Sequence, residues 1–372
     1  MSGSGHNRLL KILHIDPERN WGGGEAQVLG LLNYLISKRH RNDLLTYPQG
    51  RLFEQCQKLD MRTLPLVVRN DLDLRAVPAL RRLIRAGVYD IVHLHTKRAH
   101  ALSLWLPRGP GWPRYVVTRR MDYAEKNNWY THCLYNRRVD GIVAISCTIA
   151  TLLVQAGVDA KKVRLIPSGI DPHAFEHAAD IRQSSNGECI VGTMAVLEER
   201  KGLAFLLDAA AILKAEGLRV KYSIAGDGSL RSQLENEVIR LGLQDAIRFF
   251  GFVSDPASFL ADIDIFVMPS LYEGLGVAAL EAMAAGKAVV AARVGGLVES
   301  VIDSVTGLLV PARDPVALAR AIGKLVRNPA LARQMGQKGA ARVRQHFTME
   351  QMARGNECYY YELLAAADSF AR

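Results

Sequence analysis

The residues best suited to chemistry lie in the segment Pro269–Glu281, which follows an apolar run that reads as a strand, Ile265–Met268. Gly274 and Gly276 flank Leu275 where a helix should begin, which would leave backbone N–H groups facing an anion. In open α/β sheets, ligands bind at the carboxyl ends of strands. The segment therefore predicts a site for a phosphate or a similar anion.

Two carboxylates accompany this turn: Glu273 lies within it and Glu281 on the following helix. Carboxylates accept strong hydrogen bonds, so the pair suits the hydroxyl groups of a sugar and a ribose. The alternative interpretation is structural, with an acidic first helical turn and one surface glutamate.

A second glycine-rich turn follows the first expected strand, Leu9–Ile15, and contains Gly23 and Gly24. Glycines here would let the backbone approach a ligand closely. The dinucleotide fingerprint G-x-G-x-x-G does not fit, because Gln27 stands three positions after Gly24. A tight turn with a purely structural role is the alternative.

Polar residues also end two other expected strands of the first half. His93 and His95 alternate along the expected strand Asp90–Thr96, so both side chains should point to one face. They could line a cleft, lie in the core or lie on the surface. Another expected strand ends near Arg119, Arg120 and Asp122. These residues could present two cations and a carboxylate to an acceptor molecule.

Short apolar strands alternate with amphipathic helices along the whole chain, which predicts an α/β fold with doubly wound parallel sheets. The pattern pauses at Pro167–Pro172, a polar linker is expected over Asp180–Gly187, and the pattern then restarts. We therefore expect two Rossmann-like domains, residues 1–170 and 171–348. A closing helix over 349–372 is expected to pack back toward the first domain.

The expected elements can be stated as ranges. The remaining strands are Asp43–Tyr47, Thr63–Val67, Ile91–His95, Tyr115–Thr118, Gly141–Ile145, Cys189–Met194, Lys221–Ala225, Ile247–Phe250, Ala288–Ala292 and Gly307–Val310. The helices include Ala26–Ser37, Ala76–Ala86, Ile149–Gly157, Pro315–Arg327, Ala330–Gln345 and Met349–Ala367.

Charge is shared unevenly between the halves. Residues 1–170 hold 26 Lys/Arg against 13 Asp/Glu, and residues 171–372 hold 21 against 24. A basic first half suggests an anionic partner, and an anionic membrane face or a phosphorylated acceptor fits better than nucleic acid, since no nucleic-acid motif occurs.

The cysteine content and the apolar runs of the sequence indicate the cellular compartment. The five cysteines are scattered and lack CxxC spacing, which favours a reduced cytoplasm without a disulfide framework or zinc site. No apolar run is long enough to span a bilayer, because Glu281 and Lys287 interrupt the best candidate, Val277–Ala292. No signal peptide is expected either. A cytoplasmic protein, with possible peripheral contact to the inner membrane, is the expectation.

Several motifs of this sequence resemble those of a known family. Glu273 and Glu281 are separated by seven residues and match the E-x7-E signature of family-4 glycosyltransferases, which are retaining enzymes with the GT-B fold. Other segments resemble the family in the same order along the chain: Ile166–Asp171, Glu199–Gly202, Gly286–Ala291, Gly295–Glu299 and Asp303–Val310.

The resemblance implies a role for each matching position. Glu281 would bind the ribose of the donor nucleotide, and Glu273 would face the donor sugar. The backbone of Gly274, Leu275 and Gly276 would meet sugar hydroxyls or phosphate, and Lys201 would neutralise the departing diphosphate. The loop with Gly23 and Gly24 would face the donor phosphate and the acceptor. No metal is expected, because fixed cations and helix N-termini can stabilise the leaving phosphate.

One position departs from the family. Many members carry an arginine shortly before the lysine loop, and Val196 stands there in this chain. Arg200 could supply the second catalytic cation, although side chains at adjacent positions do not point the same way.

The resemblance implies transfer of a hexose, with retention, from a nucleoside diphosphate sugar to a hydroxyl group. The acceptor would be a saccharide or a lipid-linked molecule in the synthesis of cell-surface polysaccharide or lipopolysaccharide. The base, the sugar and the linkage stay open. Alternatives are a non-catalytic scaffold that binds sugar nucleotides, a nucleotide-sugar epimerase of the same architecture, and a nucleotide-dependent oxidoreductase.

Overall fold

The computed structural model describes residues 8–59, 61–70, 73–179 and 188–370, and the expected linker Asp180–Gly187 lies outside them. The chain divides into two compact units. Unit 1 consists of Met1–Gly169 together with Met349–Arg372, and unit 2 of Ile170–Thr348. Each unit contains one parallel sheet, so the prediction of two doubly wound α/β domains is confirmed.

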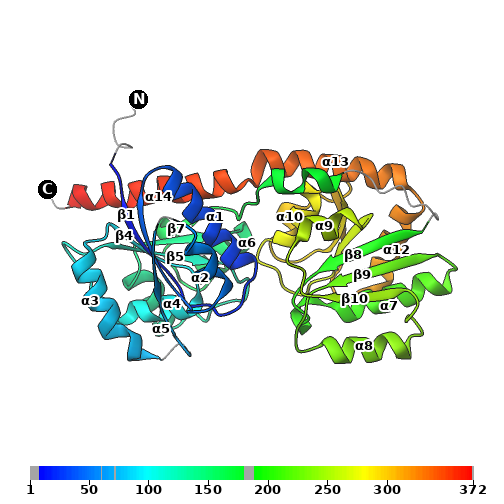
Figure 1. The fold of residues 1–372 in the computed structure, drawn as a ribbon, viewed down its shortest axis with the longest axis horizontal. Helices are drawn as coiled ribbons and strands as arrows, with labels where there is room; N and C mark the ends of the chain where they lie inside the picture. The colour runs from blue at the N-terminus through cyan, green and yellow to red at the C-terminus, as the bar shows by residue number, and fades with distance from the viewer. Residues whose placement is uncertain (1–7, 60, 71–72, 180–187, 371–372) are drawn as a thin grey trace. The chain divides into compact units, whose positions relative to one another are not determined.

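The sheet of unit 1 has seven strands in the order β3-β2-β1-β4-β5-β6-β7 (Figure 1). Its central strands are buried along nearly their whole length, as parallel strands covered by helices on both faces must be. The strands are β1 (Lys11–Asp16), β2 (Arg41–Thr46), β3 (Arg62–Pro65), β4 (Ile91–Leu94), β5 (Arg114–Arg119), β6 (Gly141–Ala144) and β7 (Val163–Leu165).

The helices of unit 1 show their apolar faces to this sheet. In α3, Val77, Leu80 and Ile84 are buried at helical spacing, while Arg81, Arg82 and Arg85 lie on other sides. The helices are α1 (Gly23–Ser37), α2 (Arg51–Cys56), α3 (Val77–Gly87), α4 (Lys97–Leu102), α5 (Trp129–Thr131), α6 (Cys147–Gln155) and α14 (Met349–Phe370).

Helix α1 begins three residues earlier than predicted, at Gly23 instead of Ala26. Gly22 has an extended backbone, and its N–H donates to the Glu25 carboxylate over 2.7 Å, which caps the helix. Gly23 and Gly24 therefore lie in the first helical turn, and the prediction that they form a loop was wrong.

The last helix, α14, belongs to unit 1 although it follows unit 2 in the chain (Figure 1). Its Met352, Ala353, Tyr359 and Tyr360 join a buried cluster with side chains of β1, β4, β5, β6 and α1. A Cβ on Gly30 of α1 would lie 2.2 Å from the Met349 sulfur, so these two helices pack closely.

The sheet of unit 2 has six strands in the order β10-β9-β8-β11-β12-β13. Four of the predicted strands match the observed bounds. The strands are β8 (Cys189–Met194), β9 (Val220–Ala225), β10 (Ile247–Gly251), β11 (Ile265–Met268), β12 (Ala288–Ala292) and β13 (Gly307–Val310). The helices are α7 (Leu203–Ala215), α8 (Arg231–Arg240), α9 (Pro256–Ala261), α10 (Val277–Ala284), α11 (Leu297–Ser300), α12 (Pro315–Val326) and α13 (Pro329–His346).

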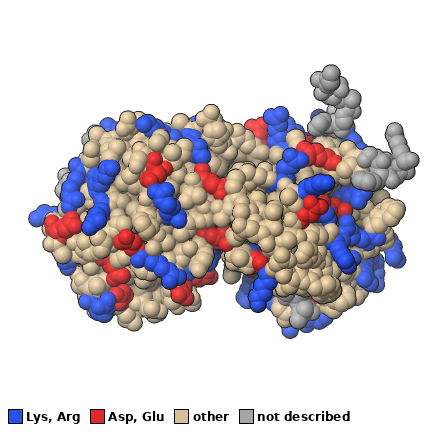
Figure 2. All heavy atoms as spheres, turned by 180° about the vertical axis from the view of Figure 1, so that it is seen from behind, with Lys and Arg blue, Asp and Glu red and all other residues tan. Residues whose placement is uncertain are grey.

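The basic excess stays with unit 1. The segment 349–372 carries two Lys/Arg and four Asp/Glu, so unit 1 has a formal charge of +11 and unit 2 of −1. On the face drawn in Figure 2, acidic side chains lie scattered among the basic ones. Within the described ranges, no helix combines the length and the apolar character that a bilayer span requires.

Candidate functional site

The first candidate site lies in unit 2, at the point where the order of its strands reverses. After β8 the chain adds β9 and β10 on one side of the sheet. It then returns to β11, next to β8, and adds β12 and β13 on the other side. Lys201 lies in the turn that follows β8, and Glu273 in the turn that follows β11. Ligands of open α/β sheets bind in the crevice at such a switch point.

Lys201 and Glu273 form an ion pair across this point, with 2.5 Å between Nζ and Oε2. The two side chains are only 10% and 12% exposed. Ser270 Oγ donates to the same carboxylate oxygen over 3.4 Å, and the Leu271 N–H donates to the Arg200 carbonyl over 2.8 Å. The pair is therefore held by two loops that are fastened to each other through the backbone.

Glycines allow the two loops to come this close. Gly202 has a φ of 63°, and a Cβ there would lie 2.1 Å from the Pro269 carbonyl oxygen. Gly276 has a φ of 86°, and its Cβ would lie 2.5 Å from Leu297 Cδ2. Since L side chains rarely adopt such backbone angles, any other residue would strain the loops that carry Lys201 and the start of α10.

Helix α10 starts at Val277, two residues after the start expected at Leu275, with Gly276 as its N-cap residue. A residue from another loop holds the turn before this helix, because the Gly296 N–H donates a hydrogen bond to the Glu273 carbonyl over 2.9 Å. A Cβ on Gly296 would lie 2.2 Å from the Gly274 carbonyl oxygen. Leu275 is buried, so this residue anchors the turn through its side chain and offers only its backbone to a ligand.

Glu281 lies one turn into α10 and is half-buried. Burial alone raises the pKa of its carboxyl group to about 7, because removing charge from water favours the protonated form. The carboxyl group can therefore exchange a proton near neutral pH. A ligand that donates hydrogen bonds to it would favour the ionised form.

Arg200 stands apart from the buried pair. Its Nε donates to the Glu198 carboxylate over 3.0 Å, and about a third of its side chain is exposed. Val196, where the resemblance leads us to expect an arginine, is 46% exposed. Lys201 is thus a buried cation of this site. Arg200 is a more exposed neighbouring cation that already forms a salt bridge with Glu198.

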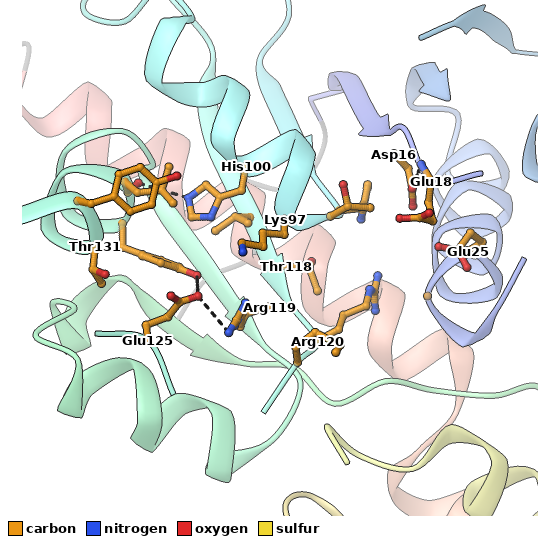
Figure 3. Close-up of a pocket in the computed structure, with 18 residues that line it drawn as sticks. Asp16, Glu18, Glu25, Lys97, His100, Thr118, Arg119, Arg120, Glu125 and Thr131 are labelled. Carbon is orange, nitrogen blue, oxygen red and sulfur yellow. Dashed lines mark hydrogen bonds and ion pairs between the residues drawn. The ribbon is translucent and has the colours of Figure 1, made fainter. Parts of the chain in front are cut away.

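The second candidate site is a pocket of about 330 Å³ in unit 1 (Figure 3). It lies where the carboxyl ends of β1, β4 and β5 meet the beginning of α1. Of the residues predicted from sequence, Gly24, His95, Arg119 and Arg120 line it, whereas Asp122 and Gly23 are not among its lining residues. Sequence reasoning missed seven of its other polar lining residues: Asp16, Glu18, Thr96, Lys97, His100, Glu125 and Thr131. The rest of the polar and aromatic lining consists of Glu25, Thr118, Tyr130 and Tyr135.

Asp16, Glu25 and Arg120 form the charged end of this pocket. Burial and the neighbouring Glu25 charge raise the pKa of Asp16 to about 7, and burial also raises the pKa of Glu25. The Arg120 guanidinium opposes both shifts by its positive charge. The position of Asp16 at the end of the first strand is the signal that could have identified it from sequence.

Arg119 has different partners. Its guanidinium lies over the Tyr123 ring, with 4.0 Å to the ring centroid, and pairs with the Glu125 carboxylate at 3.1 Å. Figure 3 shows this pair on the opposite side of the pocket from Asp16 and Glu25. The two adjacent arginines of the sequence thus point to different charged groups, as alternation along a strand requires.

Three histidines form a cluster that reaches the pocket: His14 on β1, His93 on β4, and His95, which follows β4 and lines the pocket. One ring nitrogen from each histidine lies within 4.8 Å of those of the other two, a spacing that raises the question of a metal site. His93 already contacts Tyr360 Oη at 2.6 Å and Thr118 Oγ1 at 2.7 Å. A metal ion would therefore have to break hydrogen bonds that now hold the cluster.

Burial keeps these histidines neutral. The pKa of His14 falls to about 4, and the pKa values of His93 and His95 lie well below their usual range. The structure places both predicted histidines, His93 and His95, on one face, and the pairing of β1 with β4 adds His14 to them.

Both halves of the chain match models of glycosyltransferase families. Residues 21–174 match the Glycosyltransferase Family 4 description, and residues 176–342 match Glycosyl transferases group 1. EpsF of Bacillus subtilis (strain 168), a protein named as a glycosyltransferase, is 30% identical over 302 residues, which are 74% of this chain and 77% of EpsF.

Two further similarities concern a lipopolysaccharide enzyme and a solved structure. The lipopolysaccharide core biosynthesis mannosyltransferase LpcC of Rhizobium leguminosarum bv. viciae is 30% identical over 241 residues, 61% of this chain and 66% of LpcC. The crystal structure of Anabaena HepE in complex with UDP and glucose superposes with a TM-score of 0.79 at 22% identity, covering 93% of this chain and 97% of HepE.

Proposed function

Because this chain belongs to the family-4, group 1 glycosyltransferases, we propose that it transfers a hexose from a nucleoside diphosphate sugar to a hydroxyl group, with retention of configuration. The acceptor is a saccharide or a lipid-linked molecule. The observation that carries the proposal is the buried Lys201–Glu273 pair at the switch point of unit 2, beside the N-terminus of α10.

In this proposal Lys201 and the backbone amides at the start of α10 stabilise the diphosphate as it leaves. The bond between the anomeric carbon and the phosphate oxygen breaks, and a bond from the acceptor oxygen to that carbon forms on the same face. The acceptor proton passes to the departing phosphate oxygen. Negative charge develops on that phosphate, and a fixed cation in a partly buried site stabilises it strongly. No metal enters the proposed reaction.

The two glutamates orient the donor. Glu273 faces the sugar, whose hydroxyl groups donate to its carboxylate while Lys201 turns to the phosphate. Glu281 accepts hydrogen bonds from the ribose. Because burial raises the pKa of Glu281 to about 7, donor binding would draw a proton from this carboxyl group at neutral pH. Arg200 is the proposed second cation, and it would have to exchange Glu198 for the donor.

The pocket of unit 1 is the proposed acceptor site. Its lining carries four carboxylates, Asp16, Glu18, Glu25 and Glu125, together with three cations, Lys97, Arg119 and Arg120. Such a mixture suits a ligand rich in hydroxyl groups, which both donate and accept hydrogen bonds. It suits a phosphate less well, because the carboxylates would repel it.

We place the reaction in the synthesis of cell-surface polysaccharide or lipopolysaccharide, at the inner face of the cytoplasmic membrane. The similarity to LpcC and the formal charge of +11 on unit 1 support this setting. Flotation with vesicles tests the membrane contact. Equal recovery with neutral and anionic lipid would count against it.

The decisive experiment measures donor binding and donor hydrolysis with the purified chain. UDP and UDP-glucose are tested first, because HepE was crystallised with UDP and glucose, and GDP and ADP conjugates follow. A ligand that binds the folded state raises the melting temperature by mass action. Glu281→Ala should abolish this shift. Glu235→Gln, which changes an exposed carboxylate on α8, is the matched control and should retain it.

Three outcomes would overturn the proposal in different ways. Binding without hydrolysis or transfer to any saccharide would favour a scaffold. Conversion of the donor into an epimeric nucleotide sugar would favour an epimerase. Absence of a shift with every nucleotide would remove the assigned donor site.

A further inference from the structure

A small cavity lies next to the acceptor pocket of unit 1. Its volume is about 10 Å³, close to the roughly 10–15 Å³ that one water molecule needs. His95, Thr118 and Arg120 line both this cavity and the larger pocket. Its other walls come from α1, β6, the segment that ends unit 1 and α14: Gln27, Leu31, Val143, Ile145, Ile166, Ser168, Met352 and Asn356.

Three buried polar atoms in residues that line this cavity have no hydrogen-bond partner among the described residues: His95 Nδ1, Ser168 Oγ and Asn356 Oδ1. All three residues are at least 97% buried. A buried polar atom that stays without a partner destabilises the folded state, because it has lost its hydrogen bonds to water. Because the three residues line the same cavity, a single shared ligand is the simplest partner for the three atoms.

The hydrogen bonds around His95 fix which of its nitrogens carries the proton. Asn42 Nδ2 donates to the His40 carbonyl, so Asn42 Oδ1 must accept from His14 Nε2 at 3.2 Å. His14 is neutral, and its Nδ1 is therefore an acceptor for His95 Nε2–H at 3.0 Å. His95 is also neutral, which leaves its Nδ1 with a lone pair.

The character of the other two atoms follows in the same way. Asn356 Nδ2 donates to the Met352 carbonyl over 2.9 Å, so its Oδ1 is an acceptor. The Ser168 hydroxyl can donate or accept. The cavity thus offers two acceptors and one hydroxyl donor. A water molecule matches this set, because it donates two hydrogen bonds and accepts one.

Charged ligands fit this cavity poorly. An anion would meet the lone pairs of His95 Nδ1 and Asn356 Oδ1, and a cation would lie beside the Arg120 guanidinium. Buried waters of proteins typically make about three hydrogen bonds to polar groups that would otherwise have no partner. The chemistry of the lining therefore favours a neutral molecule of this size.

We propose that this cavity binds a single ordered water molecule, which donates to His95 Nδ1 and Asn356 Oδ1 and accepts from Ser168 Oγ. The water joins α14, the acceptor pocket and the segment through which the chain leaves unit 1. That segment is already fastened at Gly169, whose N–H and carbonyl both bond to the Gln27 amide at 2.9 and 2.6 Å. His95 is thereby held in one tautomer at the pocket wall, as a positioned residue.

Ser168→Ala gives a test whose sign depends on the water. With the water present, the variant removes one of its three hydrogen bonds. A bond worth roughly 1 kcal/mol lowers the melting temperature of a domain of this size by about 2–4 °C. With a dry cavity, the variant removes a buried hydroxyl that has no partner, and the melting temperature stays or rises.

Ser103→Ala is the matched control. Ser103 Oγ is also buried without a partner among the described residues, but Ser103 does not line this cavity. A loss confined to Ser168→Ala supports the water, and equal shifts in the two variants overturn it. A high-resolution crystal structure of the full chain provides the second measurement. Density for one water near the three atoms is expected, and a dry cavity or a bound ion would refute the proposal.

Discussion

The ion pair between Lys201 and Glu273 predicts that stability and activity can be separated in unit 2. Glu273→Gln leaves the Lys201 ammonium in a site where the pair is about nine-tenths buried. Lys201→Met leaves the carboxylate there instead. The double variant removes both charges, so that no buried charge stays without its partner.

The expected magnitudes follow from the burial of the pair. Breaking a buried pair from one side costs about 3–5 kcal/mol, whereas replacing both partners by neutral groups of similar size is often nearly neutral. Because both side chains are slightly exposed, we take about 3 kcal/mol for each single variant. For a unit of this size that corresponds to a fall of roughly 6–12 °C in melting temperature.

Calorimetry is the suitable assay, because the two units can unfold in separate transitions. We expect both single variants to lower one transition and the double variant to restore it to within about 1 kcal/mol. Transfer activity should stay reduced by about 10²–10³ in all three variants, since each lacks a group that faces the donor in the proposed function. Stability losses that simply add in the double variant would refute the reasoning.

Three further predictions concern other parts of the two sites. UDP-glucose should bind about tenfold more tightly at pH 8 than at pH 6, because Glu281, whose pKa is about 7, must be ionised to accept the ribose hydroxyls as we propose; isothermal titration measures this, and a Glu281→Gln variant that keeps the pH dependence would contradict it. Gly276→Ala should destabilise the chain by about 1–3 kcal/mol and weaken donor binding, because its φ is 86° and its Cβ would meet Leu297; urea unfolding measures the loss, and unchanged stability would show that the turn relaxes. The ¹⁵N spectrum of labelled histidines should show His95 protonated at Nε2 without titration between pH 6 and 8, because burial and its bond to His14 hold it neutral; a titrating His95 signal would contradict the assigned tautomer.

Much of the fold could be predicted because buried parallel strands have a simple sequence pattern. In unit 2, Cys189–Met194, Ile265–Met268, Ala288–Ala292 and Gly307–Val310 were predicted with the observed bounds. These strands lie in a sheet that helices cover on both faces, so they read as short apolar runs. The strand Val163–Leu165 at the edge of unit 1 was not predicted, because it is short, partly exposed and contains Arg164.

The site of unit 2 was foreseeable to the extent that it depends on local sequence. The strand, glycine turn and helix around Glu273, Gly276 and Glu281 are contiguous, so their relative placement follows from the local structure. Lys201 was assigned through family resemblance alone. Its bond to Glu273 spans 72 positions and exists because β8 and β11 are neighbours in the sheet.

By itself, the sequence determined the fold class, the family and the turn that precedes α10, because periodicity, glycine and local motifs act over a few residues. Only the tertiary structure decided which distant side chains share a site. The pairing of β1 with β4 brings His14 to His93, and α14 returns to unit 1 to supply Asn356 beside Ser168. Such contacts depend on strand order and helix packing, and no local pattern in the chain records them.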